Sequence, residues 1–215
     1  MAAIVLTVAQ QKGGAGKTTL VAQLAAALAE SRRVAVLDID PQKSLTRWHA
    51  LRKEQVRAAA SGLSFADTAG WRLASEIDRL RASHDVVLID SPPHAETEAR
   101  LAVRAADLVL VPVQPSPLDL WATGPTLDLA KAEKREARLV LNRAPARGKL
   151  LDAAQAEIAR GAFPALEASL GNRSAYAMAM AAGLGVTESA PRTLAAEEVR
   201  ALASSLNPWL GKDGR

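Results

Sequence analysis

Short apolar runs alternate along the chain with amphipathic or alanine-rich segments. Uninterrupted runs rich in Val, Leu and Ile are typical of strands that are buried on both faces of a sheet. Strong runs lie at 3–9, 33–40, 85–90, 107–113 and 137–143, and weaker ones at 63–66 and 165–168. Helices are expected at 20–29, 44–56, 71–82, 97–106, 120–134, 148–160 and from 193 to the Asn-Pro pair at 207–208. This order predicts a three-layer α/β/α fold with a mostly parallel twisted sheet, in a single domain spanning residues 1–215.

Composition narrows the class of protein. The 215 residues include no cysteine, which excludes disulfides and thiolate-bound metal or iron–sulfur sites. No apolar run approaches the roughly 20 residues of a membrane span, and no leader peptide precedes the first strand. We therefore expect a cytoplasmic protein. The formal charge of +4, from 27 basic and 23 acidic side chains, permits nucleic-acid binding without demanding it.

A glycine-rich loop joins the first predicted strand to the first predicted helix, and it reads QKGGAGKTT over 11–19. Glycines let backbone amides turn toward phosphate oxygens, and the helix N-terminus adds partial positive charge. Lys17 is expected to reach the β- and γ-phosphates of a nucleotide, and the Thr18 hydroxyl to ligate Mg²⁺. The candidate nucleotide-binding residues of this loop are Gly13, Gly14, Ala15, Gly16, Lys17, Thr18 and Thr19.

The loop departs from the usual G-x-x-x-x-G-K-[ST] pattern, because Gln11 stands where the first glycine belongs. What stands instead, K-G-G-x-G-K-T-T with a second lysine at Lys12, resembles the deviant P-loop of the ParA/MinD family of ATPases. The resemblance implies a P-loop NTPase that uses ATP and Mg²⁺. It also implies an ATP-dependent homodimer in which Lys12 crosses to the phosphates bound by the partner.

Two acidic strand ends follow the loop. Asp38 and Asp40 lie two apart at the end of 33–40, on the same side of the predicted strand. The D-x-D-P-Q sequence there resembles the family's second signature, which implies that Asp40 orients the attacking water and Asp38 supports Mg²⁺. A capped turn at Asp-Pro is the alternative. Asp90 ends the run 85–90 and fits a Walker B acid that holds Mg²⁺ through water, near Thr18.

Two further positions take their roles from the resemblance. Asn142, at the end of the run 137–143, matches the family residue that contacts adenine. Asp119 closes a V-P-V-x-P-S-x-x-D passage that borders the nucleotide and the dimer interface in partition ATPases. It is equally well explained as the N-terminal cap or first-turn acid of the next helix.

Taken alone, these residues indicate phosphoryl transfer from a nucleoside triphosphate to water. The resemblance implies a ParA-type partition or positioning ATPase, whose ATP dimer binds non-specific DNA on the nucleoid and whose hydrolysis is stimulated by a ParB-like adaptor. The candidate DNA contacts are Arg147, Lys149, Arg173, Arg192 and Arg200. The helix at 44–56 is expected to carry Arg47, Arg52, Lys53 and Arg57, which form either a solvated face or a contact with DNA or a partner.

Two other functions remain as alternatives. A MinD-like ATPase would use a basic amphipathic helix to reach a membrane. Here Pro208 interrupts the last segment and only Trp209 and Leu210 are suited to insert, so no membrane partner is expected. A metabolic P-loop enzyme of the dethiobiotin synthetase type shares the fold, but Lys12 and the D-x-D-P-Q sequence favour partition. The cargo, whether plasmid, chromosome or protein cluster, is not indicated.

Overall fold

Six parallel strands form one sheet in the computed structural model, which describes residues 3–55, 63–93 and 96–211. Their order across the sheet is β3-β2-β4-β1-β5-β6, and every neighbouring pair is parallel. The strands are β1 (Ile4–Val8), β2 (Val34–Asp38), β3 (Leu63–Asp67), β4 (Val86–Asp90), β5 (Leu108–Val113) and β6 (Glu136–Leu141). The predicted α/β class with a parallel sheet is confirmed.

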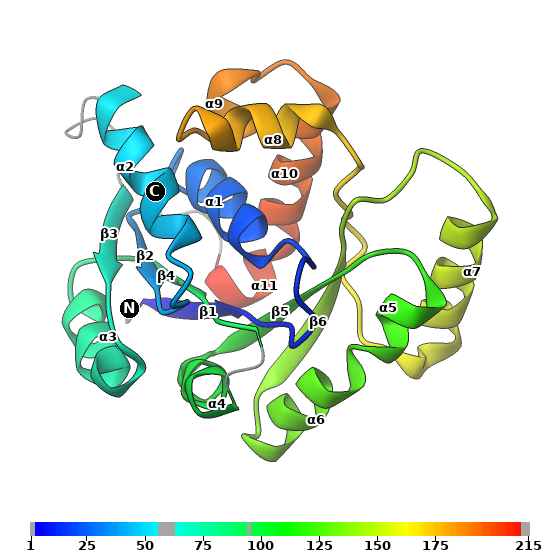
Figure 1. The fold of residues 1–215 in the computed structure, drawn as a ribbon, viewed down its shortest axis with the longest axis horizontal. Helices are drawn as coiled ribbons and strands as arrows, with labels where there is room; N and C mark the ends of the chain where they lie inside the picture. The colour runs from blue at the N-terminus through cyan, green and yellow to red at the C-terminus, as the bar shows by residue number, and fades with distance from the viewer. Residues whose placement is uncertain (1–2, 56–62, 94–95, 212–215) are drawn as a thin grey trace.

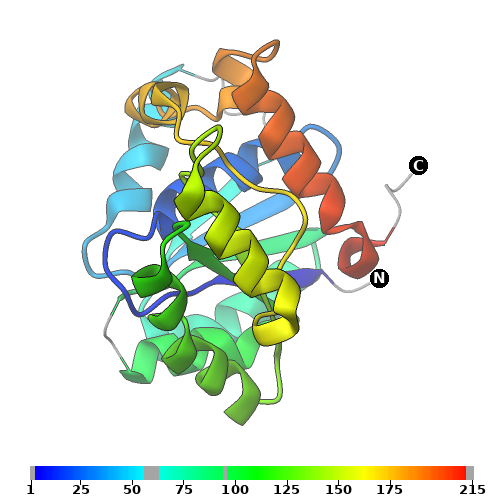
Figure 2. The same ribbon diagram turned by 90° about the vertical axis from the view of Figure 1, so that its right-hand side faces the viewer.

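Helices cover both faces of this sheet (Figure 1). One face carries α1 (Lys17–Leu28), α2 (Ser44–Gln55), α8 (Ser174–Ala181), α9 (Val186–Ser189), α10 (Leu194–Ser205) and α11 (Asn207–Leu210). The other carries α3 (Leu73–Arg81), α4 (Glu96–Ala105), α5 (Pro117–Trp121), α6 (Gly124–Ala132) and α7 (Lys149–Glu157). Figure 2 shows α7 beside α5, with α10 set apart from both at the far side of the sheet.

The core explains why the strand runs are apolar without alternation. In β4, Leu88 is buried with α1 and α10 on one face, whereas Val87 and Ile89 are buried with α3 on the other. A strand covered by helices on both faces needs apolar side chains at every position. The same pattern holds in β1, where Leu6 and Val5 belong to opposite faces.

The strand register brings the predicted acids to the glycine loop. Val8, the last residue of β1, pairs with Asp90 at the end of β4, and Asp90 in turn pairs with Asp38 at the end of β2. The carboxyl ends of parallel strands are the edge at which ligands bind in open α/β sheets. The loop, Asp38 and Asp90 therefore lie at one point of that edge.

Some element boundaries differ from the prediction. The single helix expected at 120–134 is wrong: α5 ends at Trp121 and α6 begins at Gly124, with Pro125 in its first turn. Proline has no N–H, so Pro125 cannot bond the Trp121 carbonyl and continue the helix from α5. The Thr123 hydroxyl donates to the Leu120 carbonyl oxygen at 2.6 Å at this break.

Two other elements are shorter than expected. The helix expected at 148–160 is α7 followed by a π-helical turn at Ile158–Ala162. The strand expected at 165–168 is present only as an isolated bridge between Leu139 and Ala165. A single bridge at the sheet edge lacks the row of hydrogen bonds that defines a strand.

Arg52 was expected on a solvated face or at a contact with a partner, and both expectations are wrong. It is 3% exposed, and Nη1 and Nη2 donate to the Glu188 carboxylate at 2.7 and 2.6 Å. Trp48 Nε1 donates to the Leu184 carbonyl oxygen at 3.3 Å. These contacts attach α2 to α9 and to the turn before it. Arg47 and Lys53 are exposed, and Val56 and Arg57 lie outside the described residues.

Candidate nucleotide-binding site

The glycine loop closes against the end of β6. Gly16 is the N-cap of α1 and has φ +93°. A Cβ atom at this position would lie 2.4 Å from Asn142 Nδ2, and that nitrogen donates to the Ala15 carbonyl oxygen at 2.9 Å. Only glycine satisfies both the left-handed backbone and the close approach of Asn142. The loop conformation therefore depends on a residue more than a hundred positions away.

A cavity of about 330 Å³ lies at the mouth of this loop. Of the predicted site residues, it is lined by Gly13, Gly14, Gly16, Lys17, Thr18, Thr19 and Asp40. The first amides of a helix have no intrahelical acceptor, so the N-terminus of α1 offers donors to an anion placed here. The cavity fits the phosphates of a nucleotide.

Lys17 is nearly buried and carries its charge between two acids. Its side-chain amine donates to the Gln10 carbonyl oxygen at 3.1 Å, and the residue is 7% exposed. Burial lowers the pKa of Lys17, although the charges of Asp90 and Asp40 oppose this shift. A neutral carbonyl is a weaker acceptor than a phosphate oxygen for a partly desolvated cation. We expect an entering phosphate to draw Lys17 away from Gln10.

Asp90 and Thr18 fit a Mg²⁺ site. Thr18 Oγ1 donates to Asp90 Oδ2 at 2.7 Å, while Asp90 Oδ1, fully buried, finds no hydrogen-bond partner in the part of the chain that the structure describes. Burial raises the pKa of Asp90 to about 7, assisted by Asp38 and opposed by Thr18 and Lys17. An unsatisfied carboxylate oxygen beside a hydroxyl matches the hard oxygen ligands of Mg²⁺. When bound there, the ion neutralises charge on the phosphates.

Replacing Asp90 by asparagine is expected to stabilise the metal-free protein at pH 8. An unfolded aspartate has a pKa of about 4, whereas the buried Asp90 has a pKa of about 7. The folded protein therefore loses stability from this group as the pH rises between these values, and the full penalty remains above them. Asp90→Asn should raise the free energy of unfolding by about 4 kcal/mol at pH 8 and by almost nothing at pH 4.

Urea unfolding in EDTA at both pH values measures this difference. Asp78→Asn, on the exposed side of α3, is the matched control, since Asp78 is solvated in both states. A variant that is destabilised at pH 8 would show that the Asp90 carboxylate is satisfied in the free protein.

Asp38 holds the second acidic loop in place. Its Oδ1 accepts from the Asp40 amide at 3.0 Å, and its Oδ2 accepts from the Thr46 amide at 2.9 Å and the Thr46 hydroxyl at 2.7 Å. These bonds connect the loop after β2 to the first turn of α2. Asp40 is 6% exposed, and its Oδ1 accepts from the Gln42 amide at 2.9 Å. Contact of Asp38 with Mg²⁺ stays a prediction.

Lys12 is paired within its own chain. Its amine lies 2.6 Å from Asp119 Oδ1, and its side chain is 42% exposed. Ser116, not Asp119, is the N-cap of α5, since the Ser116 hydroxyl accepts from the Asp119 amide. Burial raises the pKa of Asp119, but hydrogen bonds from Lys12 and Ser116 outweigh it and lower the pKa overall. Asp119 is thus a first-turn acid that also holds the loop lysine.

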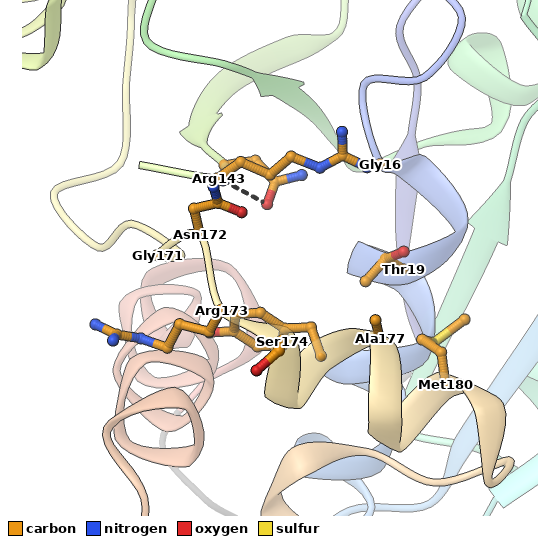
Figure 3. Close-up of a pocket in the computed structure, with 11 residues that line it drawn as sticks. Gly16, Thr19, Arg143, Gly171, Asn172, Arg173, Ser174, Ala177 and Met180 are labelled. Atoms are coloured by element: carbon orange, nitrogen blue, oxygen red, sulfur yellow. Dashed lines mark hydrogen bonds between the residues drawn. The ribbon is translucent and has the colours of Figure 1, made fainter. Parts of the chain in front are cut away.

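A second cavity, of about 750 Å³, adjoins the first (Figure 3). Gly16, Thr19, Arg143 and Met180 line both. Asn142, the predicted adenine contact, is on one wall, where its Oδ1 accepts from the Arg143 amide at 2.9 Å.

Two further parts of the lining were not predicted from the sequence. They are the segment 171–174, in which Asn172 lies beside Arg143, and across the space the α8 residues Tyr176, Ala177 and Met180 (Figure 3). No contact with a nucleotide was predicted for these positions, because they meet Asn142 only through the fold.

The predicted DNA contacts fall into two groups. Arg173 is ion-paired with Glu198, and Arg200 with Glu30 at 3.3 Å, so the structure compensates both charges internally. The remaining three, Arg147, Lys149 and Arg192, are exposed, and none has an ion pair among the described residues.

Comparison with known families identifies this arrangement. The model of the CobQ/CobB/MinD/ParA nucleotide-binding domain matches residues 6–186. The chain belongs to this family. The predicted ParA/MinD resemblance is confirmed, and the loop at 11–19 lies within the matched residues.

Relatives of known name are similar over most of the chain. The maintenance of carboxysome distribution protein A of Halothiobacillus neapolitanus is 31% identical over 213 residues, covering 96% of this chain and 97% of the relative. The protein of the same name from Gloeobacter kilaueensis is 34% identical over 188 residues, covering 86% and 84%. Protein ParA of Rhizobium radiobacter is 35% identical over 134 residues, covering 62% and 58%.

Solved structures share the ParA/MinD fold. MinD of Pyrococcus horikoshii, complexed with Mg-ADP, superposes with a TM-score of 0.80 at 19% identity, over 99% of both chains. The ATP complex of a Cyanothece McdA variant superposes with a TM-score of 0.74 at 20% identity, over 96% of both chains. At these identities the likeness establishes the fold alone.

Proposed function

We propose that this ParA/MinD-type chain is a Mg²⁺-dependent ATPase that dimerises around ATP and positions a cargo along nucleoid DNA in the cytoplasm. The observation that carries the proposal is the convergence at one sheet edge of Lys17, Asp90 with Thr18, and Asp40, with the exposed Lys12 beside them. An adaptor of the ParB kind stimulates hydrolysis.

In this proposal, each residue at the edge has one task in hydrolysis. The loop amides and Lys17 bind the β- and γ-phosphates, and Thr18 and Asp90 would hold Mg²⁺. Asp40 lines the phosphate cavity, so its carboxylate is placed to accept a hydrogen bond from the attacking water and orient it at the γ-phosphorus. Positioning and charge neutralisation supply most of the rate in such reactions.

In this proposal, dimerisation depends on Lys12, which does not bind the nucleotide of its own chain. In the free chain, Lys12 is bound to Asp119 at a half-exposed position. In the dimer, it exchanges this carboxylate for phosphate oxygens of the ATP held by a second copy. The contact is isologous, so each copy contributes its Lys12 to the site of the other. Loss of the γ-phosphate removes the contact and releases the dimer.

DNA is the favoured matrix. Arg147, Lys149 and Arg192 present exposed charges without an ion pair among the described residues, and a dimer doubles them. The residues suited to enter a membrane are engaged elsewhere: Trp209 Nε1 donates to Glu136 Oε2 at 2.9 Å, with Arg138 stacked over the ring. Within the described ranges, no helix has the length and apolar character needed to cross a bilayer.

A protein-shelled cargo is supported over a plasmid. Two relatives that match this chain over more than four fifths of its length are both named for carboxysome distribution, whereas the match to protein ParA covers 62% of the chain. We assign the chain to the positioning of such protein assemblies. The test is co-expression with fluorescent carboxysome shells: deletion of the ATPase should cluster shells that are otherwise spaced, and unaltered spacing would contradict the assignment.

The ATPase itself is tested by light scattering with size exclusion. Mg-ATP should convert the monomer to a dimer, and ADP should not. A mass that is independent of ATP, together with turnover of a small carboxylate, would favour a metabolic enzyme of the dethiobiotin synthetase type.

DNA binding is expected to depend on these exposed cations. In the ATP dimer, the double variant Arg147→Glu with Arg192→Glu should bind duplex DNA of any sequence at least tenfold more weakly in roughly 100 mM salt. The slope of log K against log[salt] should become shallower by about one for each phosphate that the variant no longer neutralises. Fluorescence anisotropy measures both quantities.

The matched control is the double variant Arg72→Glu with Arg79→Glu, which makes the same change of net charge at two exposed arginines, of which Arg72 is stacked on Trp71. It should leave the affinity and the slope nearly unchanged. An equal loss of affinity in both double variants would mean that only net charge matters and that Arg147 and Arg192 do not contact DNA.

A further inference from the structure

The Glu198 carboxylate on α10 binds three of the residues that line the larger cavity. Glu198 accepts four donors: the Gly171 amide at 3.0 Å, the Tyr176 hydroxyl at 2.8 Å, and Nε and Nη2 of Arg173 at 3.0 and 2.5 Å. All three donor residues line the cavity of about 750 Å³. Glu198 itself is not among the lining residues.

The ion pair packs closely against the backbone at Gly171. A Cβ atom on Gly171 would lie 2.9 Å from Arg173 Nε and 3.0 Å from Glu198 Oε1, so a side chain there would displace the pair. From the other side, the Asn172 amide donates to the Ala144 carbonyl oxygen at 2.9 Å. The Ala144 amide donates to the Leu170 carbonyl oxygen at the same distance. The segment 170–172 is therefore held between the continuation of β6 and α10.

The direction of the Arg173 side chain determines which groups of the segment 171–174 face the cavity. Its side chain extends away from the cavity toward α10, whereas Arg143 and Asn172 lie across the space from Ala177 and Met180 (Figure 3). The cavity side of 171–174 is thus main chain with the Asn172 amide. Main-chain groups in fixed directions distinguish a donor from an acceptor on a bound ring.

If the smaller cavity takes the phosphates, as the proposed function requires, the larger one takes the nucleoside, because the two adjoin at Gly16 and Thr19. Adenine carries an amino donor at the position where guanine carries a carbonyl acceptor. Polar groups that are held in fixed directions reject the wrong pattern more strongly than an apolar pocket does.

We propose that Glu198 is a positioning residue for nucleobase selectivity. It does not touch the nucleotide; through Gly171, Arg173 and Tyr176 it fixes the main chain that the base meets. The ion pair is only partly buried, with side-chain exposures of 31% for Arg173 and 17% for Glu198, so its contribution to folding is modest. Its larger effect is on the shape of the nucleoside site.

Competition binding distinguishes an effect of Glu198 on base selectivity from a general effect on nucleotide affinity. Affinities for Mg-ATP, Mg-GTP and inorganic tripolyphosphate are measured by displacement of a fluorescent nucleotide. In Glu198→Ala, the affinity for ATP should fall about tenfold, while those for GTP and tripolyphosphate should stay the same, so the preference for ATP shrinks. Glu197→Ala, the same charge removed from the exposed neighbour on α10, should match the wild type.

Two milder variants keep the test decisive if Glu198→Ala does not fold. Glu198→Gln retains an acceptor for the Gly171 amide, and Tyr176→Phe removes one donor without changing charge. Both should reduce the ATP preference by less than Glu198→Ala. A uniform loss of affinity for all three ligands, or an unchanged ATP preference in these variants, overturns the proposal.

The outcome in the wild-type protein is informative on its own. A wild-type chain that binds none of these ligands defeats the proposed function. A wild-type chain that prefers ATP, with variants that keep the preference, defeats only the role of Glu198.

Discussion

Lys17→Ala is expected to lower the affinity for Mg-ATP by about 100-fold, or about 3 kcal/mol. Among the described residues, Lys17 is the only lysine that lines the phosphate cavity, and its amine is held by a neutral acceptor, the Gln10 carbonyl, at 3.1 Å. An ammonium that is already partly desolvated gains a charge-assisted bond to phosphate at little further desolvation cost. Without it, Asp90 and Asp40 face the phosphates with less compensation.

Isothermal titration measures the effect. Lys17→Met, which keeps much of the side-chain volume, should bind as weakly as Lys17→Ala and so separates the charge from the packing. Lys131→Ala on the exposed side of α6 is the control and should bind ATP normally. Retained affinity in both Lys17 variants would contradict the phosphate role and, with it, the placement of the nucleotide.

Asp40→Ala is expected to reduce the rate of ATP hydrolysis by about 100-fold while ATP binding is preserved. One oxygen of Asp40 is committed to the Gln42 amide, and the side chain lines the phosphate cavity. The rate therefore falls because the attacking water is no longer oriented, while the affinity for ATP is unchanged. Because hydrolysis releases the dimer, the variant should accumulate as an ATP-bound dimer.

Single-turnover release of phosphate and the mass in solution are the two measurements. Asp40→Asn keeps an acceptor for the Gln42 amide, so a similar loss of rate in this variant assigns the effect to the charge and not to the loop. Asp67→Ala, at the end of the neighbouring strand β3, is the control. Undiminished turnover in Asp40→Ala would remove this residue from the mechanism.

The predictions that succeeded rest on short-range patterns. The buried strands β1, β2, β4 and β5 were found because strands covered on both faces are apolar at almost every position. The edge strand β6 was found from the apolar residues Leu139, Val140 and Leu141 at its end. The loop at 11–19 was found because its glycines and lysines are adjacent in the chain. The acids Asp38 and Asp90 were found because each ends such a strand, and parallel pairing then brings the strand ends together.

The ion pairs that the sequence did not predict share one property, which is a partner distant in sequence. Arg52 was expected to be a surface charge, and its partner Glu188 is 136 residues away. Arg173 is bound to Glu198 across 25 residues, and its contact with DNA stays a prediction. Charged residues give no local sign of whether an opposite charge will meet them, so composition favours the solvated reading.

The sequence by itself determined the parallel α/β architecture, the phosphate loop and the acids that face it, because each depends on residue order or on spacing within one element. Only the tertiary structure decided three contacts: the ion pair of Lys12 with Asp119, the close approach of Gly16 to Asn142, and the hydrogen bond from the Gly171 amide to Glu198. Each of these is a contact between different elements, and such contacts form only when the helices and the sheet pack together.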